Sequence, residues 1–402
     1  MLRYADDKKE GERQVRRQSP AWMNNEGVLW RAGCLVASMA CAPLLAQLPS
    51  YVRELYEVLL FFLVGWMGFC AGTYLELRVI RRVRYDTLAL ALFQAGAVLI
   101  LVALASWPAM GWVESIGGGG KHPLWVCIAL GAIAAVTLPS GSSVMSSRAE
   151  RRKEGEQTLT VLSFFGNGLT IAWVAFLAAA PDGTVGFASS RAVLLGLGIG
   201  GVAGLILDRA TRERGGGLEG IAFSTGILAV AFSLGARWDL GVFPIGAVAG
   251  VWLINATSRR LNVLEDVRRL RALLEGGLLV LLGATVPVNQ VISSEGMIAL
   301  GLGVGLSLCR FVGKLLGVRA GGRVFPRTEM GERGAVERAF MPQGGLAAAV
   351  AYALGLRGLL LVVVLCSILV NLGVSLLLEG SHGKAGKHGD RVAAWKAGGT
   401  TP

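Results

Sequence analysis

The sequence predicts an all-α polytopic membrane protein with about twelve transmembrane helices. Of its 402 residues, 53% are hydrophobic and only 16% are charged, which is more apolar surface than a soluble protein of this length can bury. Apolar runs of about 16–24 residues recur along the chain, close to the roughly 20 residues with which a helix crosses a bilayer. The shorter alternating segments of a membrane β-barrel are not seen.

The apolar runs are separated by charged or glycine-rich segments, and each run is expected to form one helix. The sixth, eighth and ninth runs are short, so eleven or thirteen spans also fit the pattern. The expected spans, in order, are 27–48, 55–76, 86–107, 124–146, 158–180, 192–207, 218–236, 240–256, 275–292, 296–317, 335–355 and 358–378.

Basic residues alternate between the connecting segments, which predicts the orientation of the chain. If the N-terminus lies inside, the inward segments and both tails hold 31 of the 39 Lys and Arg residues. Both termini are therefore expected in the cytoplasm, with tails over 1–26 and 379–402 flanking a transmembrane domain over 27–378 in the cell (inner) membrane. Topology and anionic lipid headgroups then account for the net charge of +12, and no nucleic-acid partner is needed.

Cysteine and histidine usage argues against an enzyme or a metalloprotein. The six cysteines are scattered singly and the three histidines fall in a loop and in the C-terminal tail, so no metal site or disulfide framework is expected. No nucleophile–base pair is evident either. The sequence predicts a protein without catalytic residues, metal or cofactor.

Two of the expected spans are interrupted. The fourth contains "TLPSG", with Pro139 and Gly141, and the eleventh contains "FMPQGG", with Pro342 and Gly344. Proline removes a backbone donor and glycine tolerates unwinding, and the freed backbone groups must face protein or a water-filled cavity. Spans four and eleven run in opposite directions, and such a pair is typical of inverted-repeat secondary transporters. Two ordinary proline kinks remain the alternative.

Five segments in the right order resemble the cation/proton antiporter superfamily, the sodium/proton exchanger-like membrane proteins, over roughly 30–378. The resemblance implies a dimerisation side, a six-helix core in which the two broken helices cross, elevator-like alternating access and a homodimer. It also implies exchange of a monovalent cation for protons. The segments are "LLFFLVGWMGFCAGTYLELRVIRR", "ALGAIAAVTLPSGSSVMSSR", "LSFFGNGLTIAWVAF", "LSLCRFVGKLLGVRAGG" and "RAFMPQGGLAAAVAYAL".

The chain departs from the family at the position that carries its chemistry. The family couples two ions through an intramembrane aspartate, which a cation and protons occupy in turn. Here Asn167 and Gly168 stand at that point, and no acid occurs from Thr158 to Ala180. The acids near other span ends are interpreted as interfacial or cytoplasmic residues, and replacement of the missing aspartate by one of them remains the alternative: Glu57, Glu219, Glu275 and Asp208.

The substrate site is therefore expected between spans 4, 5, 10 and 11. Thr137, Ser140 and Gln343 would supply neutral contacts there, with Asn167 and Gly168 on the fifth span. Arg310 and Lys314 share one face of the tenth span and would make the site positive beside a helix amide end, which suits an anion; Lys314 could instead reach the inner membrane surface. The sequence predicts a small-ion secondary transporter, nominally a cation/proton antiporter, with weakened or altered coupling. The alternative is a non-exchanging sensor, scaffold or gated channel.

Overall fold

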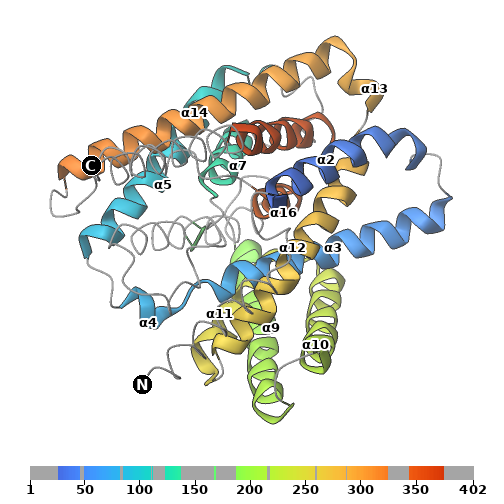
Figure 1. Ribbon diagram of the computed structural model, residues 1–402, viewed down its shortest axis with the longest axis vertical. Helices are drawn as coiled ribbons and strands as arrows, with labels where there is room; N and C mark the ends of the chain where they lie inside the picture. The colour runs from blue at the N-terminus through green and yellow to red at the C-terminus, as the bar shows by residue number, and fades with distance from the viewer. Residues whose placement is uncertain are drawn as a thin grey trace, which may run out of the picture.

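A computed structural model describes most of the expected spans, and all regular secondary structure in the described residues is helical (Figure 1). This confirms the all-α fold class. The described residues are 26–45, 49–81, 85–109, 111, 123–136, 167–168, 187–214, 218–258, 260–286, 288–324 and 344–374.

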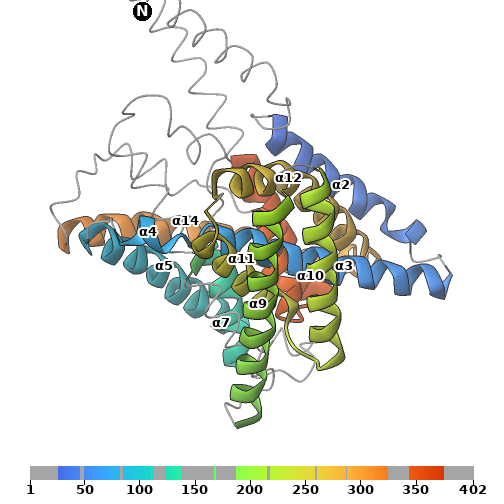
Figure 2. The same ribbon diagram turned by 90° about the horizontal axis from the view of Figure 1, so that it is seen from below.

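The helices form two groups. In the scaffold bundle, α3 packs against α11 and α12, α2 packs against α12, and α9 lies beside α10 and α11 (Figures 1 and 2). In the core bundle, α5 packs against α7 and α14. The scaffold helices are α2 (Glu26–Leu45), α3 (Ser50–Thr73), α9 (Phe187–Arg214), α10 (Leu218–Arg237), α11 (Val242–Ala256) and α12 (Arg260–Ala284). The core helices are α5 (Tyr85–Ser106), α7 (Pro123–Ala135), α14 (Ser294–Val324) and a helix over Gly358–Val374, here named the terminal helix. Helix α16 (Gly345–Ala353) is grouped with them through its packing on α7, and it also packs against α3, α11 and α12 of the scaffold bundle.

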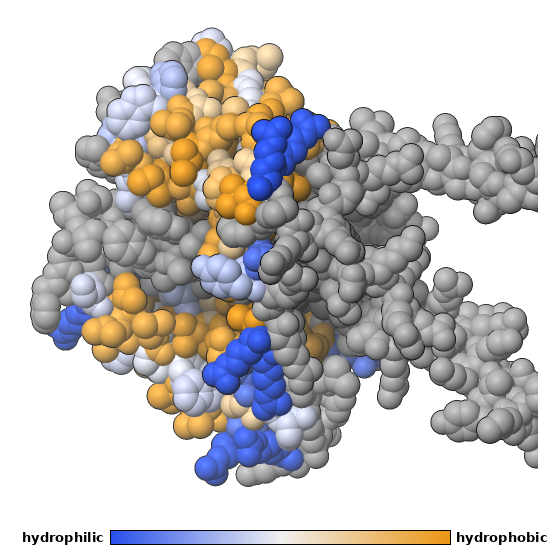
Figure 3. Space-filling view, turned by 90° about the vertical axis from the view of Figure 1, so that its left-hand side faces the viewer, coloured by the Kyte–Doolittle hydropathy of each residue, from blue (hydrophilic) through white to orange (hydrophobic). Residues whose placement is uncertain are grey.

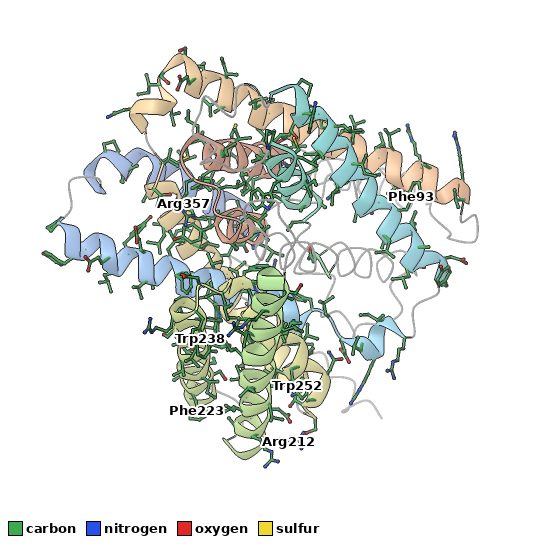
Figure 4. The ribbon with its side chains drawn as sticks, turned by 180° about the vertical axis from the view of Figure 1, so that it is seen from behind. Phe93, Arg212, Phe223, Trp238, Trp252 and Arg357 are labelled. Atoms are coloured by element: carbon green, nitrogen blue, oxygen red, sulfur yellow. The ribbon has the colours of Figure 1, made fainter. Side chains whose placement is uncertain are left out.

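Short helical segments lie at the ends of the long helices, and a tight turn joins α16 to the terminal helix. Gly355 in that turn has φ 67°, a conformation that glycine adopts without steric cost. The exposed Arg357 of the same turn places its guanidinium 3.7 Å from the centre of the Tyr352 ring (Figure 4). The short segments are α4 (Leu77–Ile80), η2 (Trp107–Ala109) and α13 (Val288–Val291).

The helices have the length and surface of a multi-pass membrane protein. Apolar side chains cover much of one face of the molecule, and strongly hydrophilic residues lie along one edge of that face (Figure 3). Within the described ranges, five helices are long and apolar enough to cross a membrane: Glu54–Thr73, Tyr85–Ala109, Ser190–Arg212, Gly220–Arg237 and Ser294–Gly321. Three shorter helices are also apolar: Pro123–Ala135, Val242–Ala256 and Gly358–Val374.

The expected spans coincide with helices wherever the structure describes them, but some boundaries were wrong. The ninth was expected over 275–292, whereas α12 begins at Arg260 and ends at Ala284. Val286 precedes Pro287, and a residue before proline is biased away from helical backbone. At the other end α12 simply continues through the charged segment "RLNVLEDVRRLR". Hydropathy marks the apolar part of a helix and misses such an extension.

Glycines bring α3 and α11 into backbone contact. A methyl group added to Gly68 or Gly72 would collide with a carbonyl oxygen of α11, and one added to Gly246 or Gly250 would collide with a carbonyl oxygen of α3. Small residues spaced by four allow this approach in membranes, where van der Waals packing between helices drives association. The contact ends at Asn255, whose amide oxygen accepts a hydrogen bond from the Leu77 backbone amide at 2.8 Å.

The backbone contact predicts a position-specific cost for one added methyl group. Gly246→Ala forces α3 and α11 apart, and overpacking of this kind costs about 1–3 kcal/mol. Gly96→Ala is the matched control, because no atom lies within 4 Å of its added methyl. Thermal unfolding of the purified protein in detergent should show a lower Tm for Gly246→Ala alone. Equal Tm values for the two variants would contradict the close packing.

Candidate functional site

In both interrupted spans a described helix ends or begins at the expected segment. Helix α7 ends at Ala135, just before "TLPSG", and α16 begins at Gly345, the last residue of "FMPQGG". Gly344 has extended backbone, with φ −146° and ψ −157°. Helices α7 and α16 pack against each other. The remaining predicted residues of the two breaks lie outside the described residues: Thr137, Pro139, Ser140, Gly141, Pro342 and Gln343.

Arg310 of α14 binds the carboxyl end of α7. Its side chain is 0% exposed. Its Nε donates to the Ala134 carbonyl at 2.8 Å and its Nη2 donates to the Val136 carbonyl at 3.1 Å. The last carbonyls of a helix have no partner within the helix, and the helix dipole places partial negative charge there. The planar guanidinium satisfies two of these carbonyls at once and supplies the opposite charge.

The terminal helix fixes the other side of the Arg310 guanidinium. Arg310 Nη1 donates to Asn371 Oδ1 at 3.1 Å. The Asn371 amide donates in turn to the Ser367 carbonyl at 2.7 Å and to Ser307 Oγ at 3.3 Å. Ser307 and Ser367 also join their hydroxyls at 3.0 Å, which closes a polar network between α14 and the terminal helix. Arg310 is thereby held in one orientation.

Lys314 lies one helical turn beyond Arg310 and is equally enclosed. It is 2% exposed, so it does not reach solvent. Among the described residues its Nζ has no hydrogen-bond partner. A buried ammonium is costly in a membrane protein unless it meets a partner or a cavity. The site therefore holds two neighbouring buried basic side chains, Arg310 bound to backbone carbonyls and Lys314 without a hydrogen-bond partner among the described residues.

Glu275 of α12 binds the amino end of α16. The backbone N–H of Gly345 donates to Glu275 Oε1 at 2.6 Å, where the helix dipole favours an anion. The carboxylate is 0% exposed. Its Oε2 lies 3.3 Å from Arg31 Nη2 and 4.0 Å from Arg271 Nε, which are ion pairs rather than hydrogen bonds. At its buried end, each broken helix therefore contacts a side chain whose charge is opposite to the partial charge of the helix dipole there.

Asn167 and Gly168 are the two described residues of the fifth span, and Gly168 lies beside the segment that follows α3. Asn167 is 2% exposed. A Cβ atom on Gly168 would lie 2.9 Å from Cδ2 of Leu75, in the segment that follows α3. A side chain at position 168 would therefore point at the scaffold bundle and would require Leu75 to move.

No buried carboxylate in the described part of the chain is free to hold a cation. The buried acids there are Asp208 and Glu275. Asp208 accepts from Arg212 Nη2 at 2.7 Å and from Arg212 Nε at 3.1 Å, near the end of α9 (Figure 4). Glu275 lies between two arginines. The same residues contain no group of three or more His, Cys, Asp or Glu side chains that could hold a metal ion.

Three interpretations of single residues were wrong. Arg310 was expected beside a possible helix amide end, but its described backbone partners are the carbonyls at the end of α7. Glu275 was expected at the membrane interface, but α12 begins fifteen residues earlier and the carboxylate is fully buried. Lys314 does not reach the membrane surface, since it is enclosed by protein.

Sequence reasoning also missed the residues that hold these charges. Ser367 and Asn371 are spaced by four in the otherwise apolar "LLLVVVLCSILVNLGV", a polar stripe on one helix face that could have been recognised. Arg271 precedes Glu275 by four, which is the spacing of an ion pair on one helix face. The role of Arg31 has no local signal, because its partner lies far away in the sequence.

The sequence matches no protein-family model and no curated protein. Among solved structures, the chain is similar to the sodium proton antiporter MjNhaP1 from Methanocaldococcus jannaschii at pH 8, with a TM-score of 0.61 and 17% identity. The match covers 87% of this chain and 92% of that chain. At this identity the likeness concerns the fold. The protein is a multi-pass membrane protein with the fold of a sodium/proton antiporter.

The contacts of Arg310 predict that its loss destabilises the core bundle. Arg310→Met leaves the Ala134 and Val136 carbonyls without donors, and each buried unsatisfied group costs about 1–3 kcal/mol. Arg310→Lys keeps the charge but cannot reach both carbonyls with a planar fork, so we expect an intermediate loss. Arg237→Met, at an exposed arginine of α10, is the control. Tm values in detergent that are equal for Arg310→Met and the control would contradict the assigned role.

Proposed function

We propose that the protein is a secondary transporter of a small ion, nominally a monovalent cation/proton antiporter that works by alternating access with weakened or altered coupling. The observation that carries the proposal is the pair of interrupted helices, α7 and α16, whose buried ends are met by Arg310 and Glu275. Interrupted helices near the membrane midplane supply the ion sites of secondary transporters. The similarity to MjNhaP1 supports a cation and protons as the substrates.

Weakened coupling between cation and proton transport follows from the missing acid at positions 167–168 and from the pairing of the buried acids with arginines. Competition between a cation and protons needs a group that loses its charge when it binds a proton. Asn167 offers an oxygen but does not ionise at physiological pH, and Gly168 offers no side chain. The buried acids of the described residues, Asp208 and Glu275, are paired with arginines. We therefore infer that ordinary, tightly coupled sodium/proton exchange is absent.

The proposal includes the surroundings of the site. Thr137, Ser140 and Gln343 line the break segments as neutral contacts in this scheme. The protein lies in the cell membrane as a homodimer with membrane lipid around it, and both tails, 1–26 and 379–402, are cytoplasmic. The alternation of Lys and Arg supports this orientation.

A second candidate function is anion binding by a non-exchanging protein of the same fold. One observation favours it: the buried ammonium of Lys314 has no hydrogen-bond partner among the described residues and lies one turn from Arg310. An anion at Lys314 would supply a partner that the described residues do not. A sensor, scaffold or gated channel could use such a site without exchange.

A restored carboxylate tests the proposed transport. Purified protein in liposomes should dissipate a pH gradient weakly or not at all when sodium, potassium or lithium is added. Gly168→Asp combined with Leu75→Ala supplies the acid together with room for it, and exchange should rise. Gly168→Asn with Leu75→Ala is the control, because it has the same size without a titrating group. Strong exchange by the wild type, unchanged by Lys314→Ala, would show that coupling depends on another acid.

Salt titration tests the anion alternative. In choline chloride, compared with choline gluconate at equal ionic strength, bound chloride should raise the Tm of the wild type. Ligand at a hundred times its Kd stabilises a protein by about 2.7 kcal/mol. Lys314→Gln should abolish the shift, whereas Arg237→Gln should keep it. If the Tm is the same in both salts, chloride does not bind at Lys314. Nitrate and bicarbonate are then the next anions to compare.

A further inference from the structure

A buried carboxylate joins the two bundles at the start of the second broken helix. Glu275 belongs to scaffold helix α12, and Gly345 is the first residue of core helix α16. Their hydrogen bond, 2.6 Å long, is formed inside protein, since the carboxylate is 0% exposed. Hydrogen bonds to an ionised acceptor are about twice as strong as neutral ones.

The carboxylate is anchored on the scaffold side by two arginines from two helices. Arg31 of α2 and Arg271 of α12 both approach Oε2, at 3.3 Å and 4.0 Å. Arg271 is itself fixed by Tyr74 at the end of α3, because its Nη1 donates to the Tyr74 hydroxyl at 2.6 Å. Three scaffold helices therefore determine where Glu275 points.

The core side of the contact is shaped to receive the carboxylate. An added Cβ atom at Gly345 would collide with Cγ of Glu275 and lie 3.3 Å from its Cβ. Only glycine allows the α16 backbone to approach this closely. Helix α16 also packs against α3 and α12, so the contact lies within the surface between the bundles.

The two partners differ in what they lose when the contact breaks. Glu275 would keep both arginines and remain a paired anion within the scaffold bundle. The first amide of α16 would lose its acceptor and would need another, because an unsatisfied amide is costly within a membrane. A contact of this kind can open without leaving an unpaired charge behind.

We propose that Glu275 is a positioning residue that latches the core bundle to the scaffold bundle in the state described here, and that the latch opens when the core bundle moves. The inference rests on the proposed alternating access. In addition, Glu275 stabilises one of the two states over the other, and it belongs to the scaffold bundle rather than to the ion site. Glu275 acts through α16 and does not contact the ion.

The latch is tested by measuring the distance between the bundles directly. Spin labels at Leu104→Cys on α5 and Val230→Cys on α10 report on core and scaffold, and both positions are exposed, at 68% and 63%. The native cysteines are replaced by serine or alanine in this background. Electron–electron double resonance should give one dominant distance when Glu275 is present.

Loss of the carboxylate should populate a second distance. Removing a hydrogen bond to a charged group shifts a two-state ratio roughly ten- to a hundredfold, so Glu275→Ala should show both states. Glu275→Gln keeps an oxygen acceptor without the charge and should give a smaller shift. Glu57→Ala removes an exposed carboxylate from scaffold helix α3 and should leave the distances unchanged.

The outcomes separate the latch from the transport function. A second distance in Glu275→Ala, smaller in Glu275→Gln and absent in Glu57→Ala, supports the latch even if no ion flux is found. Folded Glu275→Ala and Glu275→Gln proteins with the wild-type distance overturn it, even if the liposome assay shows transport. Should Glu275→Ala fail to fold, the isosteric Glu275→Gln variant decides the question alone.

Discussion

A helix that stops inside a membrane leaves carbonyls or amides unpaired, and hydrocarbon offers them no partner. The carbonyls at the end of α7 accept hydrogen bonds from Arg310, and the first amide of α16 donates a hydrogen bond to Glu275. Much of the polar architecture follows from these two contacts. The terminal helix contributes Asn371 to hold Arg310, and α2 contributes Arg31 to hold Glu275. The interruptions therefore determine where this apolar protein places its buried charges.

The two bundles hold themselves together by different means. Helices α3 and α11 meet backbone to backbone at glycines, which leaves few side-chain torsions to rearrange between them. In the core bundle, polar side chains join α14 to the terminal helix, and Arg310 joins both to α7. Each bundle is thus bound internally by several contacts. Between the bundles, the described contacts include the Glu275–Gly345 hydrogen bond and the packing of α16 on α3, α11 and α12.

Hydropathy predicted the helices well, because each must present an apolar surface over the thickness of a bilayer. Boundaries were less predictable where a helix continues through a charged segment, as at the start of α12. Within the site, Arg310 could be singled out because a guanidinium deep in an apolar run must have a partner. The type of group that Arg310 binds could not be predicted, because the sequence does not show which end of α7 lies next to Arg310. Glu275 was placed at the membrane interface because it follows a charged segment, where a carboxylate ordinarily faces water.

Arg310 and Glu275 have one further consequence, which concerns voltage. The guanidinium keeps its positive charge and belongs to the core bundle, whereas the carboxylate of opposite sign belongs to the scaffold bundle. Movement of the core bundle would therefore carry a cation through part of the membrane field and leave the anion in place. Each elementary charge moved across 100 mV changes the free energy by about 2.3 kcal/mol. The balance between the states of such a protein would depend on the membrane potential, whichever ion it carries.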